Sequence, residues 1–590
     1  MKKIIQFTLS VAICFAACKN DDDNTTQPDG PGTSTDTTPT IDSTKLDPNN
    51  YRFLKTYIDR AEHPNFKFSG ALDVNEFHNN RSGVCDTVTA HFDEIVAGNA
   101  MKYGSVVNGN GSMDFSRVKT FVADAKKVGL SIYGHTLAWH SQQQPSYLLG
   151  LMQDKEVDVP DSEKIDITDL ELSYKGLKSW NYWSSDQSEY NYSVTTGPDG
   201  VCIKNNQKAT NFWDVQYVIA DNIPTKTGGE YDITFKIKAS AATDITVVVG
   251  GWNTNNNGKI SISDEWEEVN YHIRAIKEGS GHVVLQSGDF VGEILIESLK
   301  ITHKGSGKTV ALTAKQKRDT LAWAMDHWIA GMMEATDGYV KAWDVVNEAL
   351  SGGGNDGQGN YVLQSYELNN EGDPTNVPSG VFYWQYYMGD LDYVRTAVAS
   401  ARKHFKGDAD ELKLFINDYN LESDWDDNKK VKSLVEWIKK WEADGVTKID
   451  GIGTQMHISC FEDSNIQKNI ENHIVKMFEI MAASGKLCRI SELDMGYVRG
   501  SKRWGGASLK TSQVTEAEHQ KMADFYKFII KKYFEIIPVE QQYGICQWCL
   551  TDAPSNSGWR GGEPVGIWTE KFKARKPAYI GFAKGLAGEE

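Results

Sequence analysis

The sequence predicts an α/β protein, a (β/α)8 TIM barrel with a jelly-roll-like β-sandwich inserted after its third strand. Eight short apolar runs alternate with amphipathic helical stretches over residues 48–160 and 305–590. Residues 161–304 instead contain period-two runs and turns, with no convincing helical pattern. Eight strand–helix repeats are typical of a closed parallel barrel, and the interruption indicates a separate domain within it.

The expected barrel strands are short apolar segments bounded by polar or turn residues. They lie at 66–74, just before Lys102, and at 130–136, 340–348, 412–419, 449–458, 487–495 and 543–550. Helices are expected between them, for example at 313–338 and 431–445. In the first of these helices Leu321, Ala324 and Met325 keep the spacing of one buried face. Gly445 ends the second.

The inserted segment is expected to be all β. Its strand-like runs lie at 231–239, 245–252, 266–275, 282–288 and 292–301. About 140 residues of this kind match the usual size of a β-sandwich.

The composition limits the classes of partner that the protein is expected to bind. A chain of 590 residues is too long for one compact core, and its net charge of −18 argues against nucleic acid or an anionic membrane surface as a partner. The 17 Trp and 25 Tyr residues suit sugar-binding platforms, although large cores also use them. We expect a monomer.

The N-terminus resembles a lipoprotein signal peptide, residues 1–18. Lys2 and Lys3 precede an apolar stretch that is too short to span a bilayer. Residues 15–18 resemble a lipoprotein cleavage box with Cys18 as the lipidated residue; the alternative is an ordinary signal peptide with a chance Cys. The acidic residues 21–23 resemble the export signal of some Gram-negative surface lipoproteins. Residues 19–47 are expected to form a flexible tether.

These features predict a protein anchored in the outer membrane by the lipid on Cys18 and facing the exterior. No other membrane contact is expected. Six further cysteines follow, and an exported protein can pair some of them. Cys546 and Cys549 have the spacing of a zinc or redox motif but lie in an apolar run without a second pair, so buried free thiols are expected. No metal site and no cofactor are expected.

Polar and aromatic residues gather at the C-terminal ends of the expected barrel strands, where barrel enzymes bind their substrates. Any one of them alone is more often structural, but the whole set at one rim indicates a functional site. The candidate substrate-binding residues are Asn99, Lys102, His135, Trp139, Gln142, Asn347, Tyr419, Gln455, His457, Trp548 and Trp559.

Two carboxyl groups join this set. Glu348 ends the fourth strand and Glu492 the seventh, with no metal-ligand cluster near either. A carboxyl pair flanking a cleft lined with Trp is the apparatus of glycosidic bond cleavage. One carboxyl must carry a proton and the other stay ionised. His457, one strand from Glu492, is able to hold Glu492 charged, so Glu348 is expected to be the acid/base and Glu492 the nucleophile.

The sequence resembles glycoside hydrolase family 10, the retaining endo-β-1,4-xylanases. The motifs that carry the resemblance are GHTLAWHSQ, WDVVNEAL, INDYN, GTQMHI and SELDM, in the family's order. The match covers about 48–155 and 306–590. The resemblance implies that Glu348 is the acid/base, Glu492 the nucleophile, and xylan or arabinoxylan the partner.

The resemblance also implies roles for the candidate substrate-binding residues. Asn347 binds the 2-hydroxyl of the −1 sugar, and Gln455 and His457 contact the nucleophile. The −1 and −2 sugars are surrounded by Lys102, His135, Trp139 and Gln142, with Trp548 and Trp559 stacked over them. The chain departs from the family at Gly98, where a Glu is usual. A polar contact to the −2 sugar is therefore missing or supplied elsewhere.

The insert is similar to carbohydrate-binding modules of families 4 and 9, which hold a glycan along a groove. Its candidate groove residues are Trp180, Trp183, Trp213, Tyr217 and Trp252, with Trp213 the first choice; each can equally be a core residue. Two alternatives to a xylanase stay open. One is a β-1,4-glucanase or mixed-specificity enzyme, because xylose differs from glucose by one hydroxymethyl group. The other is a glycan-capturing lipoprotein with an inactive barrel.

Overall fold

The computed structural model describes residues 47–226, 228–250, 257–275, 281–369, 379–501 and 508–589. The expected signal peptide, Cys18 and all of the expected tether except Asp47 lie outside the described residues, as does Trp252. Within the described ranges, no helix combines the length and the apolar character that crossing a membrane requires. The chain divides into two units, residues 1–152 with 314–590, and residues 153–313.

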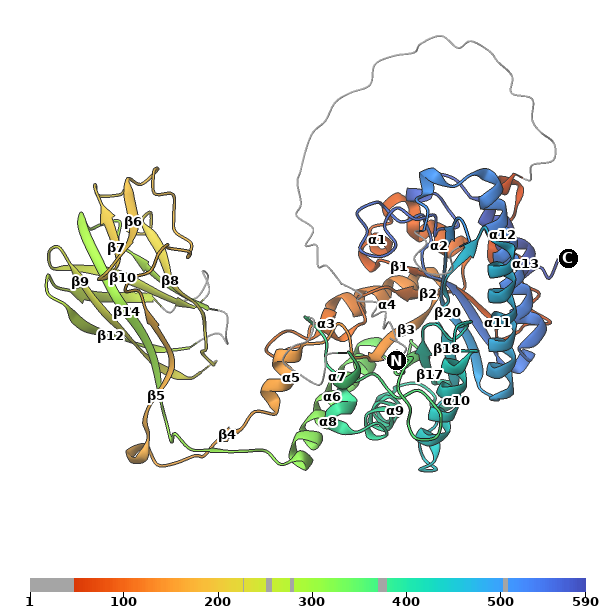
Figure 1. The fold of residues 1–590 in the computed structure, drawn as a ribbon, viewed down its shortest axis with the longest axis horizontal. Coiled ribbons are helices and arrows are strands. Elements are labelled where there is room, and N and C mark those ends of the chain that lie inside the picture. Colours follow the sequence, from red (N-terminus) through yellow and green to blue (C-terminus); the bar gives the residue numbers. More distant parts are fainter. Residues whose placement is uncertain are drawn as a thin grey trace, which may run out of the picture. The chain divides into compact units, whose positions relative to one another are not determined.

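The first unit is a closed barrel of eight parallel strands (Figure 1). Each strand pairs in parallel with its neighbours, and β18 pairs with β20 to complete the ring. The strands are β1 (Lys67–Leu72), β2 (Glu94–Ala97), β3 (Ser131–Ala138), β16 (Ala342–Asn347), β17 (Lys413–Asp418), β18 (Gly451–Thr454), β20 (Leu487–Val498) and β21 (Gln542–Gln547).

The sixth barrel strand differs from its expected form. One strand was predicted over 449–458, but the structure has β18 and then a separate β19 (His457–Phe461), which pairs with β20 at the outer end of the barrel. The break falls at Met456, whose φ of 57° is in the left-handed region and cannot continue a ladder. Gln455 and His457 therefore flank a turn of the backbone at the barrel rim.

Side chains fill the barrel interior, as in a packed core rather than a pore. Residues from six different strands form one buried apolar cluster: Ala71, Val96, Tyr133, Ala342, Phe415 and Cys546. Arg489 lies in the same interior, fully buried, with its guanidinium 3.7 Å from the centre of the Tyr133 ring and 2.8 Å from Glu94. The buried charge is thus paired and covered by an aromatic face.

Helices alternate with the barrel strands along the chain and lie outside them. The longest, α6 (Ala314–Thr336), buries the apolar residues that predicted it. The others are α1 (Val74–His78), α2 (Val84–His91), α3 (Tyr103–Val106), α4 (Ser116–Val128), α5 (Pro145–Leu151), α7 (Tyr366–Asn369), α8 (Trp384–Met388), α9 (Asp392–His404), α10 (Lys429–Glu442), α11 (Ser464–Ala483), α12 (Glu516–Ile536) and α13 (Pro577–Leu586).

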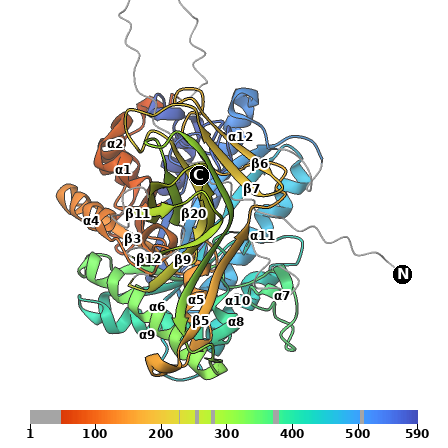
Figure 2. The ribbon, with the colours of Figure 1, turned by 90° about the vertical axis from the view of Figure 1, so that its left-hand side faces the viewer.

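The second unit consists of antiparallel sheets and, over its described residues, has no α-helix. A four-stranded sheet has the order β11-β10-β13-β8, and a larger one the order β12-β9-β14-β7-β6 with β5 beside β14; β9 and β12 run side by side in Figure 2. The strands are β5 (Ile165–Ser173), β6 (Tyr192–Gly197), β7 (Gly200–Asn205), β8 (Gln216–Ile223), β9 (Glu230–Ala239), β10 (Thr243–Gly250), β11 (Asn257–Ile262), β12 (Glu267–Arg274), β13 (Gly281–Gln286) and β14 (Gly292–Gly305).

Both sheets contribute to one buried apolar cluster, which includes Ile219 and Val247 from the smaller sheet and Phe235 and Ile296 from the larger. The chain enters and leaves this unit through a short antiparallel pair, β4 (Lys155–Glu156) with β15 (Thr309–Val310). This pair holds the two ends of the unit together. The sequence predicts the boundaries of the insert at residues 161 and 304, which lie between β4 and β15 in the chain.

The candidate groove residues of the second unit differ in exposure. Trp183 is 51% exposed and Trp213 48%. Trp180 is partly buried against the apolar cluster. Tyr217 is fully buried in that cluster, so the prediction of a groove residue there is wrong. Its place in β8 explains the result, because its side chain points to the core side of the sheet.

Candidate active site

The candidate residues lie at one rim because parallel strands bring their C-terminal ends together. Asn347 ends β16, and Glu348 follows it with a φ of 53°. Gln142, after β3, also has a positive φ, 51°. Left-handed backbone at non-glycine residues is strained, and it persists where the surrounding structure fixes it, as at functional sites. The turns that follow the strands therefore set the direction of these side chains.

Glu492 lies on β20 and is 5% exposed. Its Oε1 accepts a hydrogen bond of 2.9 Å from Asn417 Nδ2, and its Oε2 lies 3.2 Å from His457 Nε2. Burial raises the pKa of Glu492, but the hydrogen bond from His457 and the nearby charges of His135, His457 and Lys102 outweigh it, and the net direction is downward. Glu492 is therefore a buried carboxylate held in its ionised form.

His457 connects Glu492 to a second acid. Its Nδ1 lies 2.9 Å from Asp494 Oδ2, so each ring nitrogen faces a carboxylate oxygen. Both contacts are donations only if the ring is protonated. Burial lowers the pKa of His457, but the larger opposite effect of Asp494 and Glu492 raises it to about 10. The imidazolium is thus the stable form at neutral pH.

Asp494 is itself held ionised. It accepts hydrogen bonds from Arg560 Nη1 at 2.7 Å and from the indole of Trp559 at 2.9 Å. Burial raises its pKa, but His457 and Arg560 lower it to about 2. The sequence motif SELDM contained Asp494, but only the neighbouring Glu492 was predicted to belong to the site. The alternation of β20 gave the signal, because residues 492 and 494 share one face of the strand.

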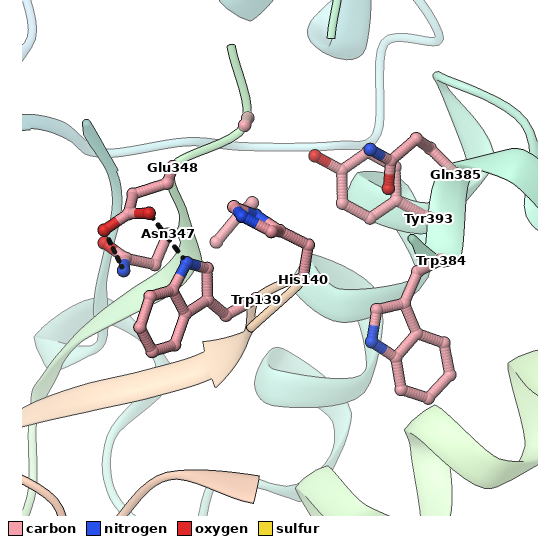
Figure 3. A pocket seen from close by; sticks show the side chains of 9 residues that line it. Trp139, His140, Asn347, Glu348, Trp384, Gln385 and Tyr393 are labelled. Carbon is pink, nitrogen blue, oxygen red and sulfur yellow. Dashed lines mark hydrogen bonds between the residues drawn. The ribbon is translucent and has the colours of Figure 1, made fainter. Parts of the chain in front are cut away.

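The hydrogen-bond donors of Glu348 are neutral instead. Its Oε2 accepts a hydrogen bond of 3.0 Å from the indole of Trp139, and its Oε1 one of 3.0 Å from Gln455 Nε2. Figure 3 shows the Trp139 indole, at the end of β3, pointing toward the Glu348 carboxyl beside Asn347. Gln455 was expected to contact Glu492; the structure places it on Glu348, because the turn at Met456 directs Gln455 and His457 to different acids.

Two asparagines connect the two acids. Asn417 Oδ1 accepts from Ser491 at 2.6 Å, so its amide nitrogen is the donor to Glu492 and, at 2.8 Å, to Asn347 Oδ1. Asn347 must then direct its own amide nitrogen to Glu348 Oε1, at 3.4 Å. The contacts fix both amide orientations. Asn417, fully buried at the end of β17, lies in the INDYN motif but was not among the predicted substrate-binding residues.

A further group of predicted residues lies beside Glu348 and Glu492. Lys102 Nζ donates to Asn99 Oδ1 at 3.3 Å and lies 5.0 Å from the centre of the Trp139 ring. Gln142 Nε2 donates to the same oxygen at 3.4 Å. Burial lowers the pKa of Lys102, opposed by the charges of Glu492 and Glu348. Asn99 therefore joins Lys102 and Gln142 into one polar group.

His135 and the rim aromatics complete the site. His135 Nδ1 lies 2.8 Å from the buried Asp344, which fixes the ring orientation. Trp548 stands edge-on to His135, with ring centres 5.4 Å apart. The ring of Trp559, 41% exposed, is 4.6 Å from that of His457. Tyr419 is different, since its side chain contacts Gln364 and Lys430 rather than either acid.

The described residues form neither a cluster of metal-ligand side chains nor a disulfide. Among them, no group of three or more His, Cys, Asp or Glu side chains is arranged to hold a metal ion. The six described cysteines are free thiols. Cys546 is fully buried and burial raises its pKa to about 12; Cys549 lies 3.9 Å from Asp494. A thiol with so high a pKa is a poor nucleophile at neutral pH.

Comparison with known proteins agrees with this geometry. Two endo-β-1,4-xylanases of Cellvibrio japonicus are similar, Xyn10C at 28% identity over 43% of this chain and xylanase A at 31% over 42%; each match covers 38% of the relative. The chain thus matches less than half the length of these relatives. The solved structure of native xylanase 10C from Cellvibrio japonicus aligns over 93% of this chain and 76% of its own, with 18% identity and a TM-score of 0.51.

The similarity to that structure concerns the fold alone. The family model of glycosyl hydrolase family 10 matches residues 58–182 and 303–584, more than half of the chain and both parts of the barrel. Glu348 and Glu492 both lie in the matched residues. The chain therefore belongs to glycosyl hydrolase family 10.

Proposed function

We propose that this protein is a retaining endo-1,4-β-xylanase that hydrolyses internal bonds of xylan by double displacement. One observation carries the proposal: two carboxyl groups at one barrel rim are joined through Asn347 and Asn417 yet have opposite surroundings. A protonated imidazole contacts Glu492, whereas neutral donors contact Glu348. Family membership and the names of the two relatives support xylan as the substrate.

The surroundings assign the two roles. The positive charge of His457 stabilises a carboxylate at Glu492, so Glu492 attacks the anomeric carbon and forms the covalent glycosyl-enzyme. Glu348 gives its proton to the departing glycosidic oxygen. It then accepts a proton from the water that attacks the glycosyl-enzyme, which releases the sugar and restores both groups. Asn347, whose amide nitrogen faces the Glu348 carboxyl, is positioned to bind the 2-hydroxyl of the reacting sugar.

The stereochemistry of the first product tests this mechanism. Double displacement gives a product with the β-configuration of the substrate, because inversion occurs twice. We expect proton NMR of xylohexaose hydrolysis to show the β-anomer first and the α-anomer only later, by mutarotation. Early appearance of the α-anomer would overturn the assignment of Glu492 as the nucleophile.

The alternatives concern specificity and activity. A β-1,4-glucanase or mixed-specificity enzyme has to accommodate the C6 hydroxymethyl of glucose near Trp548 and Trp559. Trp559 is 41% exposed, and this exposure supports the glucanase or mixed-specificity alternative. Reducing-end release from xylan, arabinoxylan, carboxymethyl-cellulose and mixed-linkage glucan distinguishes these enzymes. Binding without reducing-end release on any of the four would instead indicate a non-catalytic glycan-capturing protein.

We further propose that the second unit is an inserted β-sandwich that acts as a carbohydrate-binding module. Its two antiparallel sheets around one apolar cluster and its exposed Trp183 and Trp213 support this role. Retardation of the full chain in a gel that contains xylan, compared with a chain lacking residues 161–304, tests it.

Residues 1–18 are proposed to be a lipoprotein signal, with Cys18 carrying the lipid that anchors the protein at the cell surface. The motif around Cys18 supports this proposal. Labelling with a radioactive fatty acid should mark the wild-type protein and not Cys18→Ser, and protease added to intact cells should remove the activity. Labelling of both proteins would contradict the assignment of Cys18.

A further inference from the structure

The four-stranded sheet of the second unit has one side that does not join the apolar cluster. On β8 and β13 the cluster takes Tyr217, Ile219, Val283 and Leu285. Val218 and Val284 are not part of it, although both are 2% exposed. Because successive side chains of a strand point to opposite sides, these two valines belong to the other side of the sheet.

The strand register gives this other side a defined pattern. One row across β8, β13 and β10 is apolar, Val218, Val284 and Val248. It is flanked by a row of Gln216, Gln286 and Thr246 and by a row of Asp221, His282 and Gly250. We call these three rows the open sheet face. A mainly apolar row bordered by a few placed polar side chains is a usual composition for a ligand site.

The polar borders are already ordered. Gln286 Nε2 donates to Gln216 Oε1 at 3.1 Å. His282 Nδ1 lies 2.7 Å from Asp221 Oδ1. These contacts leave further donor and acceptor positions on each amide and on the carboxyl. A ligand with several hydroxyl groups therefore meets side chains that are already oriented.

A hollow of about 620 Å³ lies over this face, lined by Trp183, Gln216, Val218, Asp221 and His282. This volume falls within the range of roughly 300–1,000 Å³ that is usual for ligand pockets. Trp183 borders the hollow because its carbonyl accepts from Val218 N at 2.9 Å and Ser184 pairs with Tyr217. Trp183 is 51% exposed. Trp213 is equally exposed but is not among the lining residues.

We propose that the open sheet face binds a neutral β-1,4-linked glycan, with one sugar ring against Trp183 and its hydroxyl groups on Gln216, Asp221 and His282. A pyranose ring presents C–H groups on its faces, which suit the exposed Trp183 side chain, and hydroxyls at its edge, which suit amides and carboxylates. None of the five described lining residues is Lys or Arg, so an acidic ligand is disfavoured. The choice of β-1,4 linkage rests on the proposed function.

The test counts binding sites in the full chain. Glu492→Ala serves as the background, so that no ligand is hydrolysed. We expect calorimetry with xylohexaose to show two sites in this background. After the additional substitution Trp183→Ala only one site should remain visible, because the affinity of the open sheet face for xylohexaose should fall by at least about tenfold. Trp213→Ala is the matched control, with the same residue type and similar exposure, and should keep both sites. Gln286→Leu keeps the shape of the polar border and removes its amide, and should weaken the second site alone.

The outcomes separate this proposal from the proposed function. Loss of the second site in Trp213→Ala but not in Trp183→Ala would overturn the proposal, as would a single site in the background chain with both xylohexaose and cellohexaose. If cellohexaose occupies both sites and xylohexaose occupies neither, the open sheet face stands as a glycan site while the xylanase assignment fails. Circular dichroism of Trp183→Ala should match the background chain.

Discussion

The barrel rim and the open sheet face differ in the kinds of side chain that they offer to a ligand. At the rim the charged groups are buried and paired with one another, from Glu492 through His457 to Asp494 and Arg560. On the sheet face the polar groups are largely neutral, partly exposed and arranged around an apolar floor. The buried charges at the rim favour the ionised form of Glu492. The sheet face offers surface area and hydrogen-bonding partners for hydroxyl groups, as the proposed glycan binding requires.

The difference matches the role that we propose for each site. Catalysis requires a carboxylate whose charge is fixed before the substrate arrives, which a low-dielectric network supplies. Binding of a neutral polymer requires contact that is weak at each ring and repeated along the chain. If this comparison is correct, substitutions at the rim should have large effects on all substrates. Changes in the second unit should have small effects that depend on substrate length.

The largest effect is expected for Glu492→Ala. Without a carboxylate there is no covalent route, so turnover should fall by roughly 10⁵-fold or more on both xylan and aryl xylobiosides. Stopped assays with both substrates measure it. A variant that kept substantial activity on either substrate would contradict the role of Glu492.

Glu348→Ala should have a smaller and more selective effect. Loss of the acid should slow xylan hydrolysis by about 10²–10⁴-fold. A nitrophenyl xylobioside needs no proton on its leaving group, so the glycosyl-enzyme should still form and a burst of nitrophenol should be visible. Azide, a small anion that needs no general base, should restore turnover and give the β-glycosyl azide.

The matched comparison is Glu492→Ala under the same conditions, which should show neither the burst nor the azide rescue by this route. If Glu348→Ala lost aryl xylobioside cleavage as completely as xylan cleavage, the acid role of Glu348 would be wrong.

The charged network at the rim also predicts a pH dependence of stability. His457 has its pKa raised from 6.5 to about 10, against the lowering effect of burial, by Asp494 and Glu492. A group whose pKa is higher in the folded than in the unfolded state stabilises the fold fully below the unfolded value, and this stabilisation is lost as pH rises through the folded value. The free energy of unfolding of the wild type, minus that of His457→Gln, should therefore decrease between pH 6.5 and pH 10.

Urea unfolding at several pH values measures this difference. The decrease should be absent in Asp494→Asn compared with Asp494→Asn/His457→Gln, or should move to lower pH, because the main charge that raises the pKa of His457 is gone. A difference that stayed constant from pH 6.5 to pH 10 would mean that His457 is not held as an imidazolium.

The sequence predicted the barrel well because parallel barrel strands are buried on both sides and read as apolar runs. The expected run at 412–419 corresponds to β17 (Lys413–Asp418), and that at 543–550 to β21 (Gln542–Gln547). The turn at Met456 could not be predicted, because its left-handed backbone is set by tertiary contacts and Met does not favour it. Because of that turn, Gln455 contacts Glu348 instead of the expected Glu492.

The second unit was predicted less completely. The alternating runs 231–239 and 292–301 became β9 and β14, but β5 to β8 lie in segments with mixed polar composition that were not assigned. Tyr217 shows the reason: an aromatic residue in such a strand suits either side of the sheet, and only the register decides. The same register revealed Gln216 and Gln286, which no sequence pattern indicated.

The smallest effect is expected when the second unit is removed. The β4–β15 pair joins Glu156 to Thr309 and Lys155 to Val310, so a short Gly/Ser loop in place of residues 161–304 connects two ends that already lie together. A second binding site on the same chain raises the local concentration of a long polymer at the cleft without any new catalytic contact. We therefore expect a few-fold loss of activity on xylan and no loss on the short substrate xylohexaose. Initial rates on both substrates, with thermal unfolding as a control for barrel integrity, measure this. Equal loss on both would mean that the second unit only supports the barrel, and the barrel rim would then account for all the binding that activity requires.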